Sequence, residues 1–189
     1  MKNTINTLDS RVTIHSLSLS DCAYTWESVK TVWAGVEQTL KSTYLSSIGV
    51  GARSAQITFR AESAPTMQQA LEWQGKMYYP TAIVQNDRAA YVTVTAAQVE
   101  PTMATLTAYK RTAGFASFPA VLLEKYLRYA QERPMGVLSE SYVLIVPKPV
   151  ALEVADLVLV PDLGKFEVQV PHRLDPNWNQ YEITRKAER

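Results

Sequence analysis

The sequence is poor in the residues that form disulfides and metal sites: it has one cysteine, Cys22, and two histidines, His15 and His172. One cysteine excludes an internal disulfide, and these three residues are too few for an ordinary structural zinc site. Long apolar runs are also missing, because the longest, at 141–146 and 157–160, are too short to cross a bilayer. We therefore expect a protein without cofactors and without membrane contact, and the residues before position 7 lack the apolar stretch of a signal peptide.

An excess of charge of either sign is absent as well. Nineteen Lys and Arg face 18 Asp and Glu, a formal net charge of +1, so no global basic field marks a dedicated nucleic-acid binder. The motifs of common enzymes are missing: the phosphate-binding loop, the His-Glu-x-x-His pair and the Gly-x-Ser-x-Gly elbow. Residues 49–54 begin like a dinucleotide fingerprint, but Ser54 stands at the third glycine position. The sequence predicts a protein that is not an enzyme.

Short alternating runs of apolar and polar residues dominate the first hundred positions and are typical of β-strands. In the run 26–37, Val32 and Ala34 share one parity while Trp33 faces the other way, as on a strand contacted from both sides. The remaining runs lie at 12–14, 57–60, 71–73, 77–84 and 91–96, with a hairpin at Gln74-Gly75-Lys76. The pattern predicts a mainly β protein whose first domain, 1–101, is a small β-barrel or sandwich with a long loop at 38–55, which is either irregular or a flexible hairpin.

The region 102–189 begins differently. Leu122, Leu123, Tyr126, Leu127 and Ala130 recur at helical spacing, which predicts one amphipathic helix over about 118–133. Further strands are predicted at 142–146, 152–154, 157–160, 166–170 and 181–184, so the ending is β-rich. This region is either a second related barrel or an appended docking element.

A weak internal repeat favours the second barrel. Gly75-Lys76-Met77 can be laid on Gly164-Lys165-Phe166, and the strand at Tyr91 then falls near Tyr181, one residue out of step. Duplication and chance remain equally good explanations at this stage.

Two function classes compete with a purely structural one. A small barrel can bind nucleic acid through exposed aromatic residues and local cations, for which 109–111 and 185–189 are candidates. A small hydrolase would need His15 or Cys22 at its centre, although neither has an obvious partner. Asp156 and Asp162 are better explained as turn residues than as an acid–base pair.

An ordered series of segments over about residues 8–101 resembles the head-tail joining, or head closure, proteins of tailed bacteriophages. The series is Arg11-Val12-Thr13-Ile14, Thr25-Trp26-Glu27, Val32-Trp33-Ala34-Gly35-Val36-Glu37, Ile57-Thr58-Phe59-Arg60, Leu71 to Tyr78, and Tyr91 to Val99. The family's loop often starts with a Gly-Arg-Glu-like sequence, which is absent after Glu37, and residues 102–189 lie beyond the compact family domain.

The resemblance implies a structural subunit of the virion neck that forms a ring, twelvefold by analogy, and is assembled in the host cytoplasm. Its expected partners are further copies of itself, the portal or adaptor ring on the head side, the tail terminator or tail tube on the tail side, and genomic DNA in the channel. A tail terminator or other tail-side connector is the alternative within the virion.

Two segments are the candidate contact sites under this resemblance. The loop would face the channel or a partner through Lys41, Tyr44, Leu45, Ile48 and Arg53. The end of the chain would be a docking strand that orders on a partner, with Trp178, Tyr181, Ile183, Arg185 and Lys186.

Overall fold

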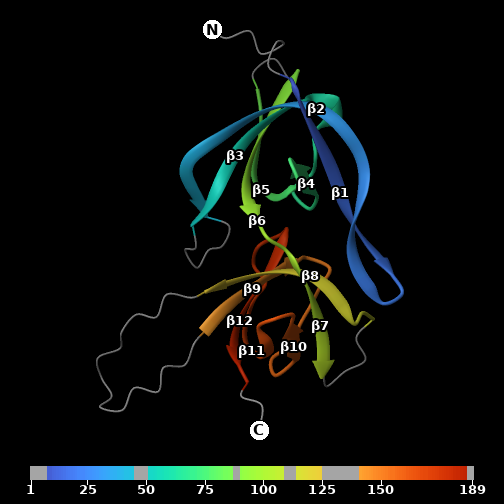
Figure 1. Ribbon diagram of the computed structural model, residues 1–189, viewed down its shortest axis with the longest axis vertical. Coiled ribbons are helices and arrows are strands. Elements are labelled where there is room, and N and C mark those ends of the chain that lie inside the picture. Colours follow the sequence, from blue (N-terminus) through green and yellow to red (C-terminus); the bar gives the residue numbers. More distant parts are fainter. Residues whose placement is uncertain (1–7, 45–50, 87–89, 109–113, 125–140, 187–189) are drawn as a thin grey trace, which may run out of the picture. The chain divides into compact units, whose positions relative to one another are not determined.

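The computed structural model describes residues 8–44, 51–86, 90–108, 114–124 and 141–186 (Figure 1). These residues form twelve β-strands and one short 3-10 turn, so the predicted mainly β class is confirmed. By its contacts the chain divides into two units. Unit 1 comprises Met1–Ser18 and Trp26–Glu100, and unit 2 comprises Leu19–Thr25 and Pro101–Arg189. The described part of the chain contains no helix that is long and apolar enough to span a membrane.

Unit 1 contains six strands that pair in a closed cycle. Around the cycle the order is β1, β4, β5, β6, β3, β2 and back to β1. The strands are β1 (Ser10–Ser20), β2 (Ala23–Tyr44), β3 (Gly51–Arg60), β4 (Ala70–Trp73), β5 (Lys76–Gln85) and β6 (Tyr91–Val99). Residues Leu19–Thr25, at the β1–β2 turn, belong to unit 2 by their contacts.

Unit 2 repeats this order. Its cycle runs β7, β10, β11, β12, β9, β8 and back to β7, so adding six to each strand number of unit 1 reproduces it. The strands are β7 (Thr102–Ala108), β8 (Ser117–Glu124), β9 (Ser141–Pro147), β10 (Leu157–Val160), β11 (Gly164–His172) and β12 (Trp178–Arg185). A strand order shared over six strands favours duplication over chance.

The two glycine-lysine turns occupy matching places in the cycles. Gly75 lies in the turn between β4 and β5, and Gly164 opens β11 after the turn 161–163 that follows β10. Both have a positive φ, +71° and +99°, which glycine adopts at little cost. The alignment of these turns in the sequence therefore corresponds to the structural repeat.

Each unit has a hydrophobic core of its own. Alternate residues of the strands point inward, as the period of two requires. The fully buried side chains of the unit 1 cluster include Ile14, Ile57, Phe59 and Leu71. Those of unit 2 include Phe118, Leu144, Leu152, Phe166, Val168, Tyr181 and Ile183.

The predicted helix at 118–133 is not found in the described residues. Ser117–Glu124 is the strand β8, which pairs with β7 on one side and β9 on the other, and residues 125–133 lie outside the described residues. Four consecutive residues, Phe118 to Val121, are buried. Successive residues of a strand point to opposite faces, so four consecutive buried residues show that both faces of β8 are covered there, whereas an amphipathic helix would bury one stripe. The predicted strand at 152–154 is also wrong, since these residues form a loop and turn.

Candidate functional site

Most of the predicted loop at 38–55 is a pair of strands. β2 continues to Tyr44 and β3 begins at Gly51, with Gln38 paired to Ala55 and Ser42 to Arg53. Of the two expectations for this stretch, the loop is wrong at both ends and the hairpin agrees with the pairing. Threonine and tyrosine residues that break the apolar alternation still favour strands. Lys41 and Tyr44 belong to β2 and Arg53 is an exposed residue of β3, whereas Leu45 and Ile48 lie outside the described residues.

This pair of strands extends past the rest of the sheet as an arm, defined here as residues 42–44 and 51–53. Ser54 with Ala97 is the last pair between β3 and β6, so, among the described residues, 51–53 pair with β2 alone. A shift of register between Thr39 and Ser42 separates the arm from the body of β2. Figure 1 shows both strands running together to the grey segment that joins them.

The predicted docking strand at the end of the chain is part of the unit 2 core. β12 pairs with β11 on one side and β9 on the other, and Trp178, Tyr181 and Ile183 are buried. These three side chains are therefore unavailable to a partner, and the prediction that they order only on docking is wrong. Arg185 and Lys186 are exposed, and Lys186 Nζ lies 3.2 Å from a Glu167 carboxylate oxygen. In the sequence, this last strand cannot be distinguished from a free tail. The structure shows that it pairs on both edges and that its apolar side chains are buried.

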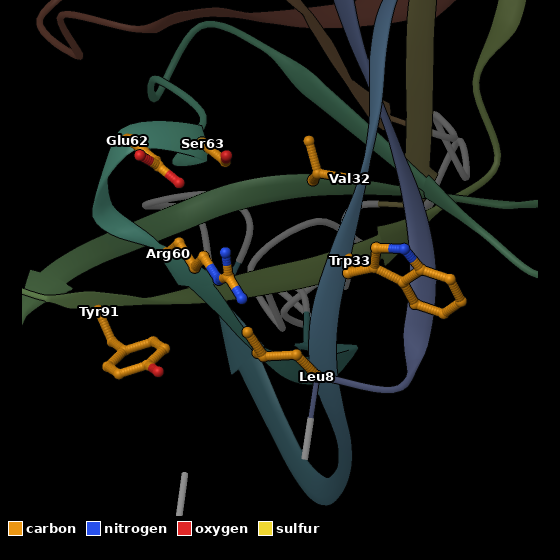
Figure 2. Close-up of a pocket in the computed structure, with 7 residues that line it drawn as sticks. All are labelled: Leu8, Val32, Trp33, Arg60, Glu62, Ser63 and Tyr91. Carbon is orange, nitrogen blue, oxygen red and sulfur yellow. The ribbon is translucent and has the colours of Figure 1, made fainter. Parts of the chain in front are cut away.

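A hollow of about 520 Å³ lies on the outside of unit 1. Its lining residues come from β2, β3, β6, the 3-10 turn and the residue before β1: Leu8, Val32, Trp33, Arg60, Glu62, Ser63 and Tyr91. Figure 2 shows the Arg60 side chain between Trp33 and Tyr91, with its guanidinium directed toward the middle of the hollow. Sequence reasoning did not identify this hollow.

Strand parity explains why these side chains gather there. Arg60 of β3 pairs with Tyr91 of β6. Trp33, Arg60 and Tyr91 each stand next to a buried core residue, namely Ala34, Phe59 and Val92, so all three face outward. Trp33 is 60% exposed. Its parity opposite to Val32 and Ala34 was the one signal in the sequence for this surface.

The hollow combines aromatic surface with charges that have no described partner. Arg60 and Glu62 are both exposed, and neither forms an ion pair with another described residue. Trp, Tyr and Arg are the residue types that most often carry binding energy in protein interfaces. The hollow therefore has the chemistry of a docking surface.

The two histidines are each paired with one carboxylate on a neighbouring strand. His15 Nε2 lies 3.0 Å from Glu72 Oε2, and His172 Nε2 lies 3.1 Å from Glu182 Oε1. Cys22 is exposed in the β1–β2 turn at a φ of +61°. Neither histidine has a described contact with a nucleophile, and no three His, Cys, Asp or Glu residues cluster as metal ligands in the described ranges.

One ionisable group is strongly perturbed. Burial raises the pKa of Tyr79, and the hydrogen bond that Trp26 Nε1 donates to its hydroxyl, 3.1 Å long, acts in the opposite direction. The shift comes from desolvation within the fold rather than from a charged neighbour in a cleft, so it indicates packing and not a reactive site.

Comparison with known proteins leaves the family open. No family model matches the chain, and no curated protein matches it. One solved structure with a likeness to the chain is protein SF1141 from Shigella flexneri 2a, a solution structure with 14% identity and a TM-score of 0.39. The alignment covers 51% of this chain and 96% of that protein. A likeness of this size carries no conclusion about fold or function.

Proposed function

We propose that this chain is a structural protein of a tailed-phage neck: a ring-forming head closure or head-tail joining subunit that retains packaged DNA and offers a surface to the tail. The observation that carries the proposal is the two-stranded arm of unit 1, which stands at the loop position of the resemblance. In this proposal each closed six-strand cycle is a small barrel, and the chain is a tandem pair of them.

The arm fits a role that is completed by other subunits. A two-stranded hairpin is marginally stable alone in water. An arm whose described pairing lies within the arm itself is therefore suited to ordering against neighbours in a ring or to adding strands to a partner. Arg53, exposed on the arm, is a cation available to DNA or to an acidic partner.

The overall charge is compatible with a channel subunit. A strongly basic wall would bind DNA phosphates tightly and slow the passage of the genome, whereas 19 basic against 18 acidic residues do not produce such binding.

Ring closure requires a heterologous contact in which two different surfaces of each subunit meet. Two units with different outer faces provide different surfaces for the head side and the tail side.

The first experiment counts copies. Peptide mass spectrometry of DNA-filled particles and of free tails, relative to the major capsid protein, should find about one ring of this chain per particle and none in free tails. Presence in free tails would favour the tail-side connector instead. Absence from both would contradict a virion role, and titration with single-stranded DNA would then test nucleic-acid binding.

The second experiment removes the arm and keeps the fold. Residues 43–52 are replaced by Asn-Gly, which closes a two-residue hairpin between the paired Ser42 and Arg53. We expect unchanged thermal unfolding of the purified protein, together with heads that lose DNA or fail to join tails. Normal infectivity of this variant would contradict the role of the arm.

A further inference from the structure

The β10–β11 turn of unit 2 presents a leucine and an aspartate together. Pro161, Asp162 and Leu163 are all exposed, and the pair Val160–Gly164 closes the turn beneath them. Leu163 is 47% exposed, and its backbone N–H donates to Val160 O over 3.2 Å. The Asp162 carboxylate forms no ion pair with another described residue. The turn is therefore a protruding apolar group beside an unneutralised negative charge.

The hollow of unit 1 offers the complementary chemistry. Leu8, Val32 and Tyr91 supply apolar surface, and the Arg60 guanidinium supplies a positive charge without a described partner. The Trp33 ring borders the hollow and extends across β2, away from Arg60 (Figure 2). We propose that the 161–163 turn of one copy docks in this hollow of a second copy, with Leu163 against the apolar lining beside Tyr91 and Asp162 facing Arg60. The inference rests on the proposed function in one respect: a ring subunit must contact itself through two different surfaces.

Charge favours a protein partner over nucleic acid at this hollow. A single-stranded nucleic acid is held by several cations along its backbone, together with stacked aromatic side chains. Among the described residues that line the hollow, Arg60 is the one cation, and Glu62 offsets it. A leucine with one carboxylate matches this surface better than a chain of phosphates.

Leu163 is better suited to enter the hollow than the other exposed apolar residues. Leu174 is fully exposed, but the carboxylate of its neighbour Asp175 accepts hydrogen bonds from the N–H groups of Asn177 and Trp178. Val154 is exposed next to Glu153, which has other interactions. Among the described residues, Leu163 is the exposed large apolar residue that adjoins an acid without such engagements.

The test is a charge swap measured by sedimentation velocity over a range of protein concentrations at low salt. Arg60→Glu and Asp162→Lys should each weaken self-association at least about tenfold, because like charges then meet at the contact. An equimolar mixture of the two variants should recover association, since each hollow then meets a turn of opposite charge in an alternating assembly. The double variant should recover it alone.

Further variants separate charge from folding and packing. Trp33→Ala should weaken association about thirtyfold or more. Asp162→Asn removes the charge and tolerates the left-handed backbone at this position (φ +63°), so its loss of association would not reflect strain. Lys76→Glu, the same charge change at an exposed site of unit 1, and Leu174→Ser should leave association unchanged.

The outcomes are distinct. A wild-type chain that stays monomeric at all concentrations, or single variants that associate like the wild type, would overturn the inference. Loss of single-stranded DNA binding in Arg60→Glu, with self-association unaffected, would assign the hollow to nucleic acid. Arg60→Glu particles with a complete neck would refute the contact and leave the proposed function standing. If the charge swap restores self-association but the chain is absent from virions, the contact would be supported and the proposed function would be contradicted.

Discussion

The two units share one strand order and differ in the connection that follows the third strand in chain order, which is β3 in unit 1 and β9 in unit 2. In unit 1 the residues after β3 form the 3-10 turn, and Glu62 and Ser63 there line the open hollow. In unit 2 the residues after β9 are held inward: the Asn179 side-chain amide donates to the carbonyls of Lys148 and Val150, and Leu152 N–H donates to the Tyr181 hydroxyl. The strand cycle thus sets the core, and the connections determine which surface stays open to a partner.

A second difference is the connection between the second and third strands. β2 has 22 residues and β3 has 10, whereas the corresponding β8 and β9 have 8 and 7. Part of the extra length forms the arm of unit 1. Residues 125–140, which join β8 to β9, lie outside the described residues.

The largest expected effect tests whether the two cores are equivalent. Phe59 and Phe166 are buried in the clusters of unit 1 and unit 2, respectively. We expect Phe59→Ala and Phe166→Ala each to lower the free energy of unfolding by about 3–5 kcal/mol, because each leaves a cavity in a packed core. Urea denaturation measures both, with Leu174→Ala, at a fully exposed site, as a control that changes less than about 0.5 kcal/mol. A loss below about 1 kcal/mol for either phenylalanine would break the equivalence.

An intermediate effect contrasts two buried tyrosines. Tyr181 Oη accepts from Leu152 N–H at 2.9 Å, so Tyr181→Phe leaves a buried donor without a partner and should cost about 1–3 kcal/mol. The Tyr78 hydroxyl of unit 1 is buried and has no hydrogen-bond partner in the described structure. Tyr78→Phe should therefore be neutral or stabilising in the same thermal and urea measurements. Equal losses at both positions would show that the polar network does not distinguish unit 2.

The smallest effect concerns the hairpin turns. Gln74 has a φ of +52° and precedes Gly75 in a two-residue turn between the paired Trp73 and Lys76. Asparagine is the residue preferred at this position before glycine, so Gln74→Asn should raise the free energy of unfolding by about 0.5 kcal/mol. Calorimetry compares it with Gln74→Val, whose β-branched side chain disfavours positive φ and should destabilise. A gain from valine would exclude the assigned turn geometry.

Alternation predicted the strands that carry a clear inside and outside. The runs around Ile57, Val94 and Val168 appear in the structure as β3, β6 and β11, because a period of two in apolar residues needs no tertiary context to be recognised. The Gln74-Gly75 turn was predictable for the same reason, since its chemistry is local.

The helix prediction failed where the signal was ambiguous. Leu122 and Leu123 fit a helical stripe, yet they belong to β8, whose first half pairs with β7 and whose second half pairs with β9. A short apolar run that is buried on both sides looks the same in a strand and in a helix, and only the neighbours decide. The arm and the docking strand were misjudged for a related reason, since strand pairing by Thr43 or burial of Trp178 depends on residues distant in the chain.

The sequence by itself determined the β class and the positions of most strands, because these depend on side-chain period and local backbone preference. It indicated the match of the two glycine turns, which the shared strand order then supported. The tertiary structure alone decided the closed cycles, the hollow at Trp33, Arg60 and Tyr91, and the burial of the last strand. These features arise from pairing between segments far apart in the chain, such as Arg60 with Tyr91, and no local pattern encodes such pairing.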